Sequence, residues 1–440
     1  MALHPVLNEK LQVALRESPG HTLTRRDARL AAVPGKVHSV IGMRRAGKTT
    51  FLHQLHDQRR LELPPERVLY MSFDDDRLAG MGSEQLGFLV EEYYRLRPEL
   101  RGKESVHWFL DEIQFVPGWE RFVRRVLDTE KVEVVVSGSS ARMLSKEVHT
   151  SLRGRGMATV IRPFSFREFL RHRGEEPPED WSPTPKERSL VEKRFREYLA
   201  GGGFPEAQGL DATVRIELLQ GYVDTVLFRD VVERHHVSQV EALRWLVRHC
   251  LRNPAGSFSA HRLHQDLRSQ GHGVAKDAVH AMLGHLLDAF LLSSVPLATD
   301  SERQRNSNPR KIYPADPGLI RAFDASGRSN VGHALETVVF LELERRKAEV
   351  GYVKTGSGQE VDFLARHRTG EEDLIQVCAN LEQQETRERE VRALNEAGVA
   401  HPRARRRLLV LDRDAAAGPG WPGVEVQPAY EWLLRPASPA

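Results

Sequence analysis

The sequence contains little cysteine and no long apolar run. Of its 440 residues only 2 are cysteines, Cys250 and Cys378, and they lie far apart. Two distant cysteines exclude a disulfide framework and a cysteine-based zinc module, and they fit a reducing compartment. No stretch approaches 18 apolar residues, and the segment 1–16 is interrupted by three polar residues, so neither a membrane span nor a signal peptide is indicated. We therefore expect a cytoplasmic protein.

The chain also lacks a strong excess of charge of either sign. It has 64 basic and 61 acidic residues, a net charge of +3, which is too small to indicate a nucleic-acid partner by itself. With 40% hydrophobic and 28% charged residues, the composition excludes wholesale disorder and collagen-like repeats. The histidines do not show the paired spacing of a zinc protease helix. At roughly 150 residues per domain, the length predicts about three globular domains.

Three segments with different patterns follow one another. The first third alternates apolar runs with helical spacing, which predicts a parallel α/β sheet with helices on both faces. The next part is mostly helical and ends in an amphipathic stretch at 274–290, a short strand, a basic loop at 299–311 and another strand, which suggests a winged helix. A small α/β domain follows, with a helix from 331 and strands at 360–364, 374–378 and 408–411. The strands predicted in the first third are 37–41, 68–73, 106–110, 132–137 and 159–163.

A phosphate-binding loop is predicted at 42–49, where GMRRAGKT satisfies G-x-x-x-x-G-K-[ST] between a strand and a helix. Glycines at its two ends let the backbone curl so that successive N–H groups point at phosphates, and the helix start adds a positive dipole. We expect Lys48 to contact the β- and γ-phosphates of ATP and the Thr49 hydroxyl to bind Mg²⁺. The residues predicted to bind the nucleotide are Gly42, Arg45, Ala46, Gly47, Lys48, Thr49 and Thr50.

Two adjacent carboxylates, Asp111 and Glu112, follow the apolar strand 106–110. The carboxyl edge of a parallel sheet is where ligands bind. We expect Asp111 to hold Mg²⁺ and Glu112 to act as the general base on the attacking water. Hydrolysis as well as binding is therefore predicted.

Three further residues are weaker candidates for catalysis. The predicted strand at 132–137 leads into the segment SGSS at 137–140, and the hydroxyls of Ser139 and its neighbours Ser137 and Ser140 could sense the γ-phosphate or the water, although serines here are also ordinary turn formers. Arg153 and Arg155 could supply positive charge to the transition state, within the subunit or in a neighbouring one. Structural salt bridges are the competing explanation for both arginines.

Taken together, these residues resemble a known family, the bacterial and archaeal AAA-like P-loop ATPases that carry a winged helix and a C-terminal domain with a restriction-endonuclease-like fold. The resemblance covers nearly the whole chain, with one departure at Met43, where the family usually has proline. Its specific segments are GMRRAGKTT at 42–50, YMSFDDDRL at 70–78, LDEIQFVPGWE at 110–120, SGSSARML at 137–144, RPFSFREFL at 162–170 and GGFPE at 202–206.

The resemblance implies an ATPase of the division that has an added strand between the P-loop and the acidic strand, with 68–73 as that strand and Glu112 as catalytic base. It also implies a homo-oligomer, with a hexamer as one option. The predicted domains are an N-terminal helical segment at 1–30, a P-loop ATPase domain at 31–208, a helical and winged-helix domain at 209–328 and a nuclease-like domain at 329–440.

The nuclease-like domain lacks part of the PD-(D/E)xK set that holds magnesium and orients water. Glu336 fits the helical position and Asp362 fits the first strand carboxylate. Where the pattern requires Glu-x-Lys, the chain has Gln376 and Cys378, so a carboxylate and an amine are both lost. We expect an inert nuclease fold that grips DNA or forms an oligomer contact, and we expect Cys378 to be a core thiol.

The winged helix would place the helix 274–290 in the DNA major groove. This helix offers Lys276, with His280 and His285, and the expected loop adds further cations that suit phosphate contacts with little sequence choice. Such a module also serves for protein docking or as a nucleotide lid. The residues predicted to contact DNA are Lys276, Arg303, Arg305, Arg310 and Lys311.

Two functions are consistent with these patterns. The first is an oligomeric ATPase that couples ATP turnover to binding or remodelling of DNA, such as branched or processed duplex. The second is a signalling switch ATPase whose nucleotide state controls protein association without DNA.

Overall fold

The computed structural model describes residues 3–16, 23–31, 33–138, 152, 154–324, 330–381, 383–416 and 420–435. The chain forms two compact units, Met1–Arg162 and Pro163–Ala440. The first unit contains one sheet of five strands, and the second contains one sheet of three strands and another of five.

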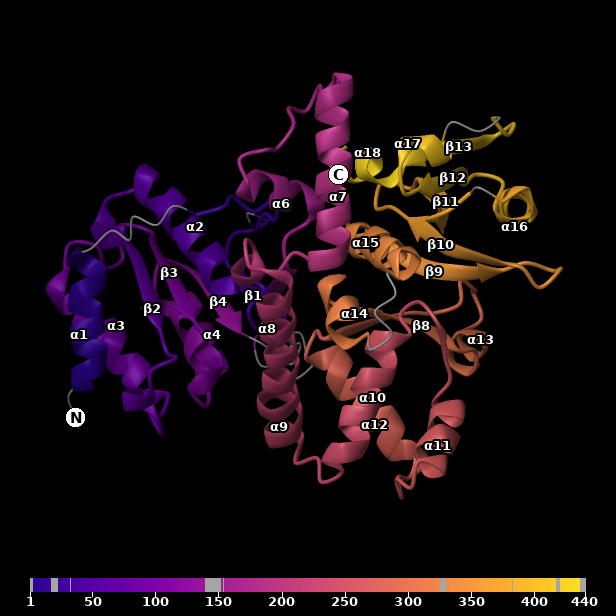
Figure 1. Ribbon diagram of the computed structural model, residues 1–440. Helices are drawn as coiled ribbons and strands as arrows, with labels where there is room; N and C mark the ends of the chain where they lie inside the picture. Colours follow the sequence, from indigo (N-terminus) through magenta and orange to yellow (C-terminus); the bar gives the residue numbers. More distant parts are fainter. Residues whose placement is uncertain are drawn as a thin grey trace. The chain divides into compact units, whose positions relative to one another are not determined.

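The first unit is built on a five-stranded parallel sheet with the order β2-β3-β4-β1-β5 (Figure 1). Four of the strands agree with the predicted ranges to within one residue. The fifth begins three residues before the predicted range and ends before Pro163, which has no N–H to give to a ladder. The strands are β1 (Val37–Ile41), β2 (Val68–Ser72), β3 (Val106–Asp111), β4 (Val132–Gly138) and β5 (Gly156–Val160).

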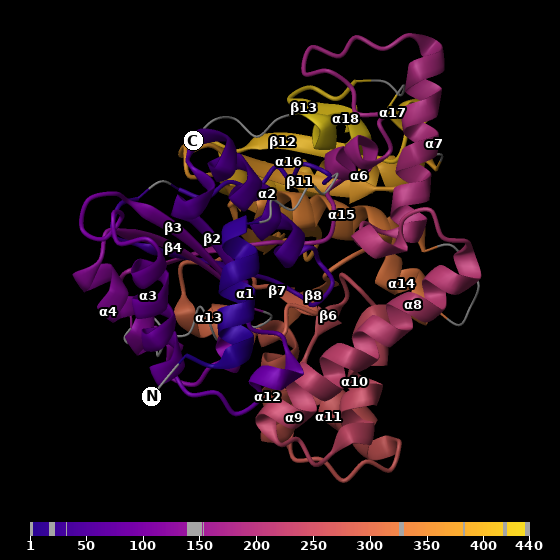
Figure 2. The ribbon, with the colours of Figure 1, turned by 90° about the vertical axis from the view of Figure 1, so that its left-hand side faces the viewer.

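The strand that separates the P-loop strand from the acidic strand is β4. Its residues pair with β1 on one side and with β3 on the other, whereas β2 lies at the edge of the sheet beside β3. Figure 2 shows β2, β3 and β4 side by side. The assignment of 68–73 as the added strand is therefore wrong, because chain order does not reveal which strand is inserted between two others in space.

Helices cover both faces of this sheet. Successive residues of a strand point to opposite faces, and on β3 the ring of Trp108 packs against Tyr93 of α3, while Phe109 packs against His56 of α2. α1 contacts β2 and α3. The α-helices are α1 (Pro5–Arg16), α2 (Lys48–Glu62), α3 (Glu84–Leu96) and α4 (Trp119–Thr129), with short 3₁₀ helices η1 (Pro65–Arg67), η2 (Asp76–Leu78) and η3 (Ile113–Phe115).

The second unit begins with helices and contains a small antiparallel sheet of three strands in the order β6-β8-β7. A π-helix at Val226–Val232 joins α8 to α9. The elements are α6 (Phe166–His172), α7 (Pro185–Gly201), η5 (Pro205–Ala207), α8 (Ala212–Thr225), α9 (Glu233–His235), α10 (Val240–Arg252), β6 (Ser257–Phe258), α11 (Ala260–Ser269), α12 (Lys276–Asp288), β7 (Leu292–Val295), α13 (Glu302–Ser307), β8 (Arg310–Pro314) and α14 (Gly318–Phe323).

The second unit ends in a mixed sheet with the order β13-β12-β11-β10-β9, in which β11, β12 and β13 are parallel and the other pairs antiparallel. Both α15 and α16 contact β11, and they pack into two separate apolar clusters. The elements are α15 (Val331–Arg345), β9 (Glu349–Lys354), β10 (Glu360–Arg366), β11 (Glu372–Cys378), α16 (Gln384–Ala400), β12 (Arg405–Val410), α17 (Arg413–Ala416), β13 (Val424–Pro428) and α18 (Ala429–Leu434).

The GGFPE segment is a packing motif of the second unit. The fully buried carboxylate of Asp316 accepts N–H groups of Gly203 at 2.7 Å and Gly318 at 2.9 Å. A Cβ on Gly202, whose φ is +76°, would lie 1.7 Å from Asp316 Oδ1. A Cβ on Gly203 would lie 2.2 Å from the carbonyl oxygen of Phe164. The glycines therefore allow three segments that are distant in the chain to touch through their backbones.

Gly203→Ala is expected to destabilise the protein by about 1–3 kcal/mol, because the added methyl meets backbone atoms that cannot rotate away. The check is a urea unfolding curve that follows tryptophan fluorescence. Gly221→Ala is the matched control. Gly221 lies in the helix α8, and a Cβ at this position would meet no atom within 4 Å. If both variants unfold at the same urea concentration, the proposed role of the close approach at Gly203 is wrong.

Candidate functional site

The loop between β1 and α2 has the backbone of an anion-binding cradle. Gly42 has a φ of +146°, and a Cβ there would lie 2.1 Å from the carbonyl oxygen of Ile161. Arg45 and Gly47 are left-handed, with φ values of +63° and +94°. A left-handed residue in such a turn brings neighbouring N–H groups to one side. α2 begins at Lys48, so the positive end of its dipole faces the same cradle.

The Lys48 side chain lies within this loop. Its ammonium donates a hydrogen bond to the carbonyl oxygen of Met43 at 3.2 Å, and the residue is only 5% exposed. Thr49 and Thr50, in the first turn of α2, are exposed. A buried ammonium beside the N–H groups of the loop and an exposed hydroxyl is the donor set that a phosphate chain with a divalent cation requires. The predicted nucleotide-binding residues at 42–50 are thus brought together.

The acidic pair lies at the end of β3, whose neighbours in the sheet are β2 and β4. Asp111 is buried and accepts hydrogen bonds from the Tyr70 hydroxyl at 2.9 Å and from the Ser137 hydroxyl. The N–H of Glu112 donates to the oxygen of that same Ser137 hydroxyl at 2.9 Å. The Gln114 amide donates to the Glu112 carboxylate. Ser137 therefore fixes both members of the pair from the neighbouring strand.

Glu112 has the surroundings expected of a base. Burial raises the pKa of its carboxyl above the ordinary value, while the Lys48 ammonium and the Gln114 amide oppose this shift. The backbone of Glu112 is left-handed, with a φ of +54°, a conformation that costs a non-glycine residue about 1–2 kcal/mol. A raised pKa allows a carboxylate to accept a proton from water more readily.

Three residues that support the site, Ser137, Tyr70 and Arg26, carry no local sequence signal of that role. Arg26 is buried, and its guanidinium donates to the carbonyl oxygen of Ala46 at 3.1 Å and to that of Arg162. It thereby ties the P-loop backbone to the segment after β5. No local pattern predicts these hydrogen bonds, because the bonded residues are 20 to 136 positions apart in the chain.

The remaining catalytic candidates are Ser139, Arg153 and Arg155. Ser139 and Arg153 are outside the described residues. Arg155 precedes β5, whose first residue pairs with Val37, the first residue of β1, whereas the P-loop follows the last residue of β1. The Arg155 guanidinium forms a salt bridge to Asp128 at 2.5 Å. Arg155 therefore lies at the opposite edge of the sheet from the P-loop.

Comparison with known families places the first unit. Residues 34–170 match the family model described as "AAA domain", and residues 192–330 match a domain of unknown function, DUF8612. An uncharacterized protein of Methanocaldococcus jannaschii is 32% identical over 397 residues, which is 89% of this chain and 84% of the archaeal protein. The chain belongs to the same family as this archaeal protein. Residues 34–170 of this chain form an AAA-type P-loop ATPase domain.

Two further similarities accompany this match. An uncharacterized protein of Haemophilus influenzae is 27% identical over 330 residues, covering 74% of this chain and 78% of that protein. The solved Walker-type ATPase of Pyrococcus abyssi aligns with 72% of this chain and 95% of its own, at 12% identity and a TM-score of 0.41. Because this structural likeness is distant, the assignment of the ATPase domain depends on the family match and on the geometry of the site.

The residues predicted to contact DNA fall into two groups. Lys276 and Arg303 are exposed, and Arg310 is half-buried. The predicted loop 299–311 contains the helix α13, and its Arg305 forms a 3.0 Å salt bridge to Glu349. Lys311 is 3% exposed and ion-paired with three carboxylates, so we remove it from the DNA contacts. A basic residue in a polar stretch predicts exposure, but here the strand β8 turns the lysine inward.

The predicted nuclease-like residues converge only in part. The backbone N–H of Asp362 donates to the side-chain oxygen of Gln376 at 3.2 Å, and Glu336 is linked to Asp362 through the ammonium of Lys311. Cys378 instead donates to the carbonyl oxygen of Asn380 at 3.1 Å, and burial raises the pKa of its thiol. Glu336, Asp362 and Gln376 therefore share one site, and the thiol has a separate partner.

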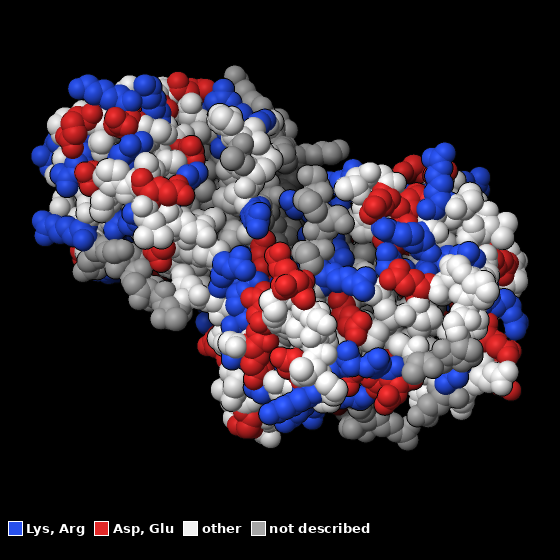
Figure 3. All heavy atoms as spheres, turned by 90° about the horizontal axis from the view of Figure 1, so that it is seen from above, with Lys and Arg blue, Asp and Glu red and all other residues white. Residues whose placement is uncertain are grey.

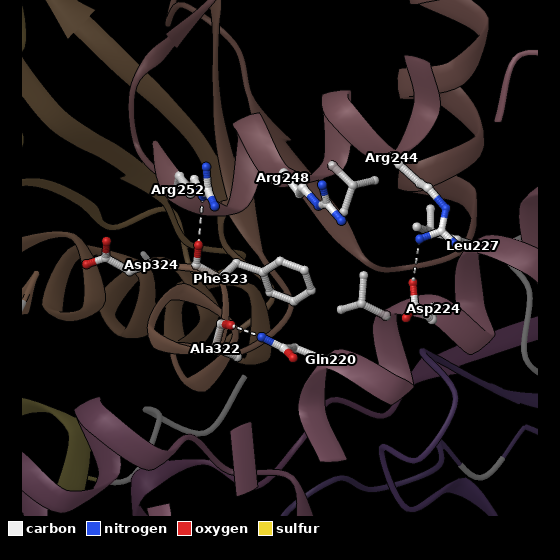
Figure 4. A pocket seen from close by; sticks show the side chains of 11 residues that line it. Gln220, Asp224, Leu227, Arg244, Arg248, Arg252, Ala322, Phe323 and Asp324 are labelled. Atoms are coloured by element: carbon white, nitrogen blue, oxygen red, sulfur yellow. Dashed lines mark hydrogen bonds and ion pairs between the residues drawn. The ribbon is translucent and has the colours of Figure 1, made fainter. Parts of the chain in front are cut away.

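A cavity of about 310 Å³ lies between α8, α10 and α14 (Figure 4). Arg244, Arg248 and Arg252 of α10 line it at intervals of one turn. Arg244 pairs with Asp224 at 3.7 Å, and Arg252 donates to the carbonyl oxygen of Phe323 at 2.8 Å. Acidic and apolar residues thus share the wall, and we assign no ligand to this cavity.

Surface charge is mixed on the face seen from above. On the face seen in Figure 3, basic side chains lie among acidic ones without an extended patch of one sign. No helix in the described ranges has the length and apolar character needed to cross a bilayer.

Proposed function

We propose that Lys48, Thr49, Asp111 and Glu112 carry out the ATP hydrolysis of this AAA domain. Lys48 would contact the β- and γ-phosphates, while the N–H groups of the loop hold the phosphate oxygens. Thr49 and Asp111 would hold Mg²⁺, which supplies positive charge to the phosphate chain when bound. The single observation that supports this assignment is the hydrogen-bonded set at the carboxyl ends of β3 and β4, which lies beside the P-loop.

In this proposal Glu112 takes a proton from the attacking water. The water oxygen forms a bond to the γ-phosphorus as the bond from that phosphorus to the β–γ bridging oxygen breaks, which releases ADP and phosphate. Ser137 and Gln114 hold Glu112 in place. The Ser137 hydroxyl oxygen accepts the backbone N–H of Glu112, and the Gln114 amide donates to its carboxylate. Ser139 and Arg153 remain weaker candidates in the same reaction.

Arg155 is proposed to act in a neighbouring subunit of a homo-oligomer. Its place at the edge of the sheet away from the P-loop supports this view, since the side chain cannot serve its own site. The salt bridge to Asp128 would have to open in the assembly, and both side chains are solvent-accessible enough to allow this.

We propose that the second unit binds DNA and that ATP turnover is coupled to this binding. The supporting observation is the order α10, β6, α11, α12, β7, β8 with the antiparallel sheet β6-β8-β7, which is the order of a winged helix. α12 would then enter the major groove, with Lys276 and His280 exposed on it. The segment between β7 and β8 would be the wing, where Arg303 is exposed.

The proposed DNA contacts are of the kind that recognises phosphates. Side chains for reading bases are few on α12, and Lys276 shares the exposed surface with Asp277 and Asp288. We therefore expect affinity with little sequence choice. The mixed sheet of β9–β13 is proposed to be nuclease-like, with Asp362 on β10 and Gln376 on β11 in the positions of the metal-binding strands.

The interspersed charges support a second candidate function, a switch ATPase whose nucleotide state controls protein association. In that case the winged helix would dock a protein. The two candidates differ in their response to DNA.

DNA is expected to increase the rate of ATP turnover, and its affinity should fall steeply with salt. In the double variant Lys276→Ala, Arg303→Ala, the slope of log K against log salt should decrease by about 2, because two phosphate contacts are lost. The measurement is fluorescence anisotropy of labelled duplex over a salt series. Arg305→Ala is the matched control, since that arginine is already paired with Glu349. No DNA binding by the wild type would favour the switch function.

A further inference from the structure

The side chain of Lys311 reaches from β8 into a cluster of carboxylates. Its Nζ lies 3.1 Å from Glu336 Oε1 on α15, 2.9 Å from Glu360 Oε1 and 2.9 Å from Asp362 Oδ1, both on β10. The lysine is 3% exposed. Three carboxylates from two elements therefore surround one ammonium group.

The ammonium and the carboxylates satisfy one another. The Lys311 ammonium donates hydrogen bonds to Glu336 at 3.1 Å and to Asp362 at 2.9 Å, and it is ion-paired with Glu360 at 2.9 Å. Glu336 Oε1 also accepts the Tyr313 hydroxyl at 2.8 Å, and Asp362 Oδ2 accepts the N–H of Val377 at 3.0 Å. Burial acts to lower the pKa of Lys311, but the carboxylates outweigh it and raise the pKa, so the amine stays charged. Burial and the neighbouring Asp362 raise the pKa of Glu336.

Gln376 completes the surroundings as a neutral group. Its side-chain oxygen accepts the N–H of Asp362 at 3.2 Å, and its amide donates to the carboxylate of Glu390 at 2.7 Å. A glutamate could not make the second bond while ionised, because an ionised carboxylate has no donor. The amide therefore suits a local network that already includes the buried acid Glu390.

A divalent cation does not fit this arrangement. Magnesium and calcium need oxygen ligands at about 2.0–2.6 Å, and an ion between the same carboxylates would lie next to the positive charge of Lys311. The residues that a nuclease would use for its metal are engaged by the ammonium instead.

We propose that Lys311 is a built-in cation that takes the place of a divalent metal ion between Glu336, Glu360 and Asp362 and keeps this nuclease-like site metal-free. The proposal rests on the nuclease-like interpretation of β9–β13 and is independent of the ATPase site. Since β8 belongs to the proposed winged helix, the same contact fastens that module to α15 and β10.

The test counts Mn²⁺ ions bound to the full-length chain by electron paramagnetic resonance, without nucleotide. Lys311→Ala is expected to bind one more Mn²⁺ per chain than the wild type, because removal of the ammonium leaves three carboxylates around a vacant space. Lys311→Ala combined with Asp362→Asn should return to the wild-type count, which separates this site from the P-loop. If Lys311→Ala is poorly folded, Mn²⁺ should raise its melting temperature, while the wild type should not respond.

Arg310→Ala is the matched control, since it removes a cation from the adjacent position of β8 and should add no Mn²⁺ site. Two results would overturn the proposal. One is a wild-type Mn²⁺ ion that disappears in Asp362→Asn. The other is a Lys311→Ala protein that neither binds an additional Mn²⁺ nor gains thermal stability from it. Both outcomes leave ATP turnover by the first unit unaffected, so they do not bear on the ATPase assignment.

Discussion

Replacement of Glu112 by glutamine is expected to reduce ATP turnover by about 10²–10⁴-fold, the usual contribution of a positioned general base. The amide cannot accept the proton of the attacking water. ATP binding should persist, because the P-loop and Lys48 are untouched. Single-turnover hydrolysis and calorimetric ATP binding measure the two effects separately. Unchanged turnover would exclude Glu112 as the base.

The raised pKa of Glu112 adds a pH dependence to the same variant. A base must be ionised, so wild-type turnover should fall on the acid side at a higher pH than an exposed glutamate would give. Because folding raises this pKa, the ionised side chain costs stability as the pH rises through the interval between the unfolded and folded values. Glu112→Gln should therefore melt at a higher temperature than the wild type at neutral pH, and this gain should vanish in acid.

Lys48→Ala is expected to weaken ATP binding by about tenfold or more, since a hydrogen bond to a charged group contributes about 1.5–3 kcal/mol. Turnover should fall by a further 10²–10³-fold or so, because the ammonium also stabilises charge in the transition state. ATP titration and steady-state hydrolysis provide the measurements.

A matched control for Lys48 is Lys36→Ala, which removes a lysine at the other end of β1. The Lys36 ammonium donates to the carbonyl oxygen of Gly154 at 2.7 Å, away from the P-loop. Its loss should leave ATP affinity and turnover near the wild-type values. An equal effect of both substitutions would mean that Lys48 acts only through the overall charge.

The parts of the ATPase site that follow from local pattern could be predicted from the sequence. The strand β1 and the loop 42–49 are contiguous in the chain, so the motif and the strand that precedes it can both be recognised in one segment of sequence. The pair Asp111 and Glu112 follows an apolar run in the same way. The hydrogen bonds of Ser137 and Tyr70 to Asp111 could not be predicted, because they depend on which strands are neighbours in the sheet. That order is decided by packing across long chain separations.

In the second unit, the prediction that Lys311 is exposed and contacts DNA failed for a different reason. Lys311 stands in a polar, basic stretch, and such a stretch predicts solvated side chains. Its burial follows from β8, which is covered on both faces because residues 311–314 are all buried, and its ammonium reaches Glu336 of α15 and Asp362 of β10. The neutral residue Gln376 did predict a loss of metal ligands, but nothing in the local sequence indicated that a lysine from another element would supply the balancing charge.

The hydrogen bonds of Arg26 affect where a fragment of the isolated ATPase domain should begin. The family match begins at residue 34, which invites an expression fragment starting there. Such a fragment would lack Arg26, whose guanidinium donates to the carbonyl oxygens of Ala46 and Arg162 and whose backbone N–H donates to the side-chain oxygen of Gln54 on α2 at 2.8 Å. Two carbonyls beside the phosphate cradle would then face solvent or pair wrongly. A fragment that starts before Thr24 retains Arg26 and therefore the hydrogen bonds that support the phosphate-binding loop.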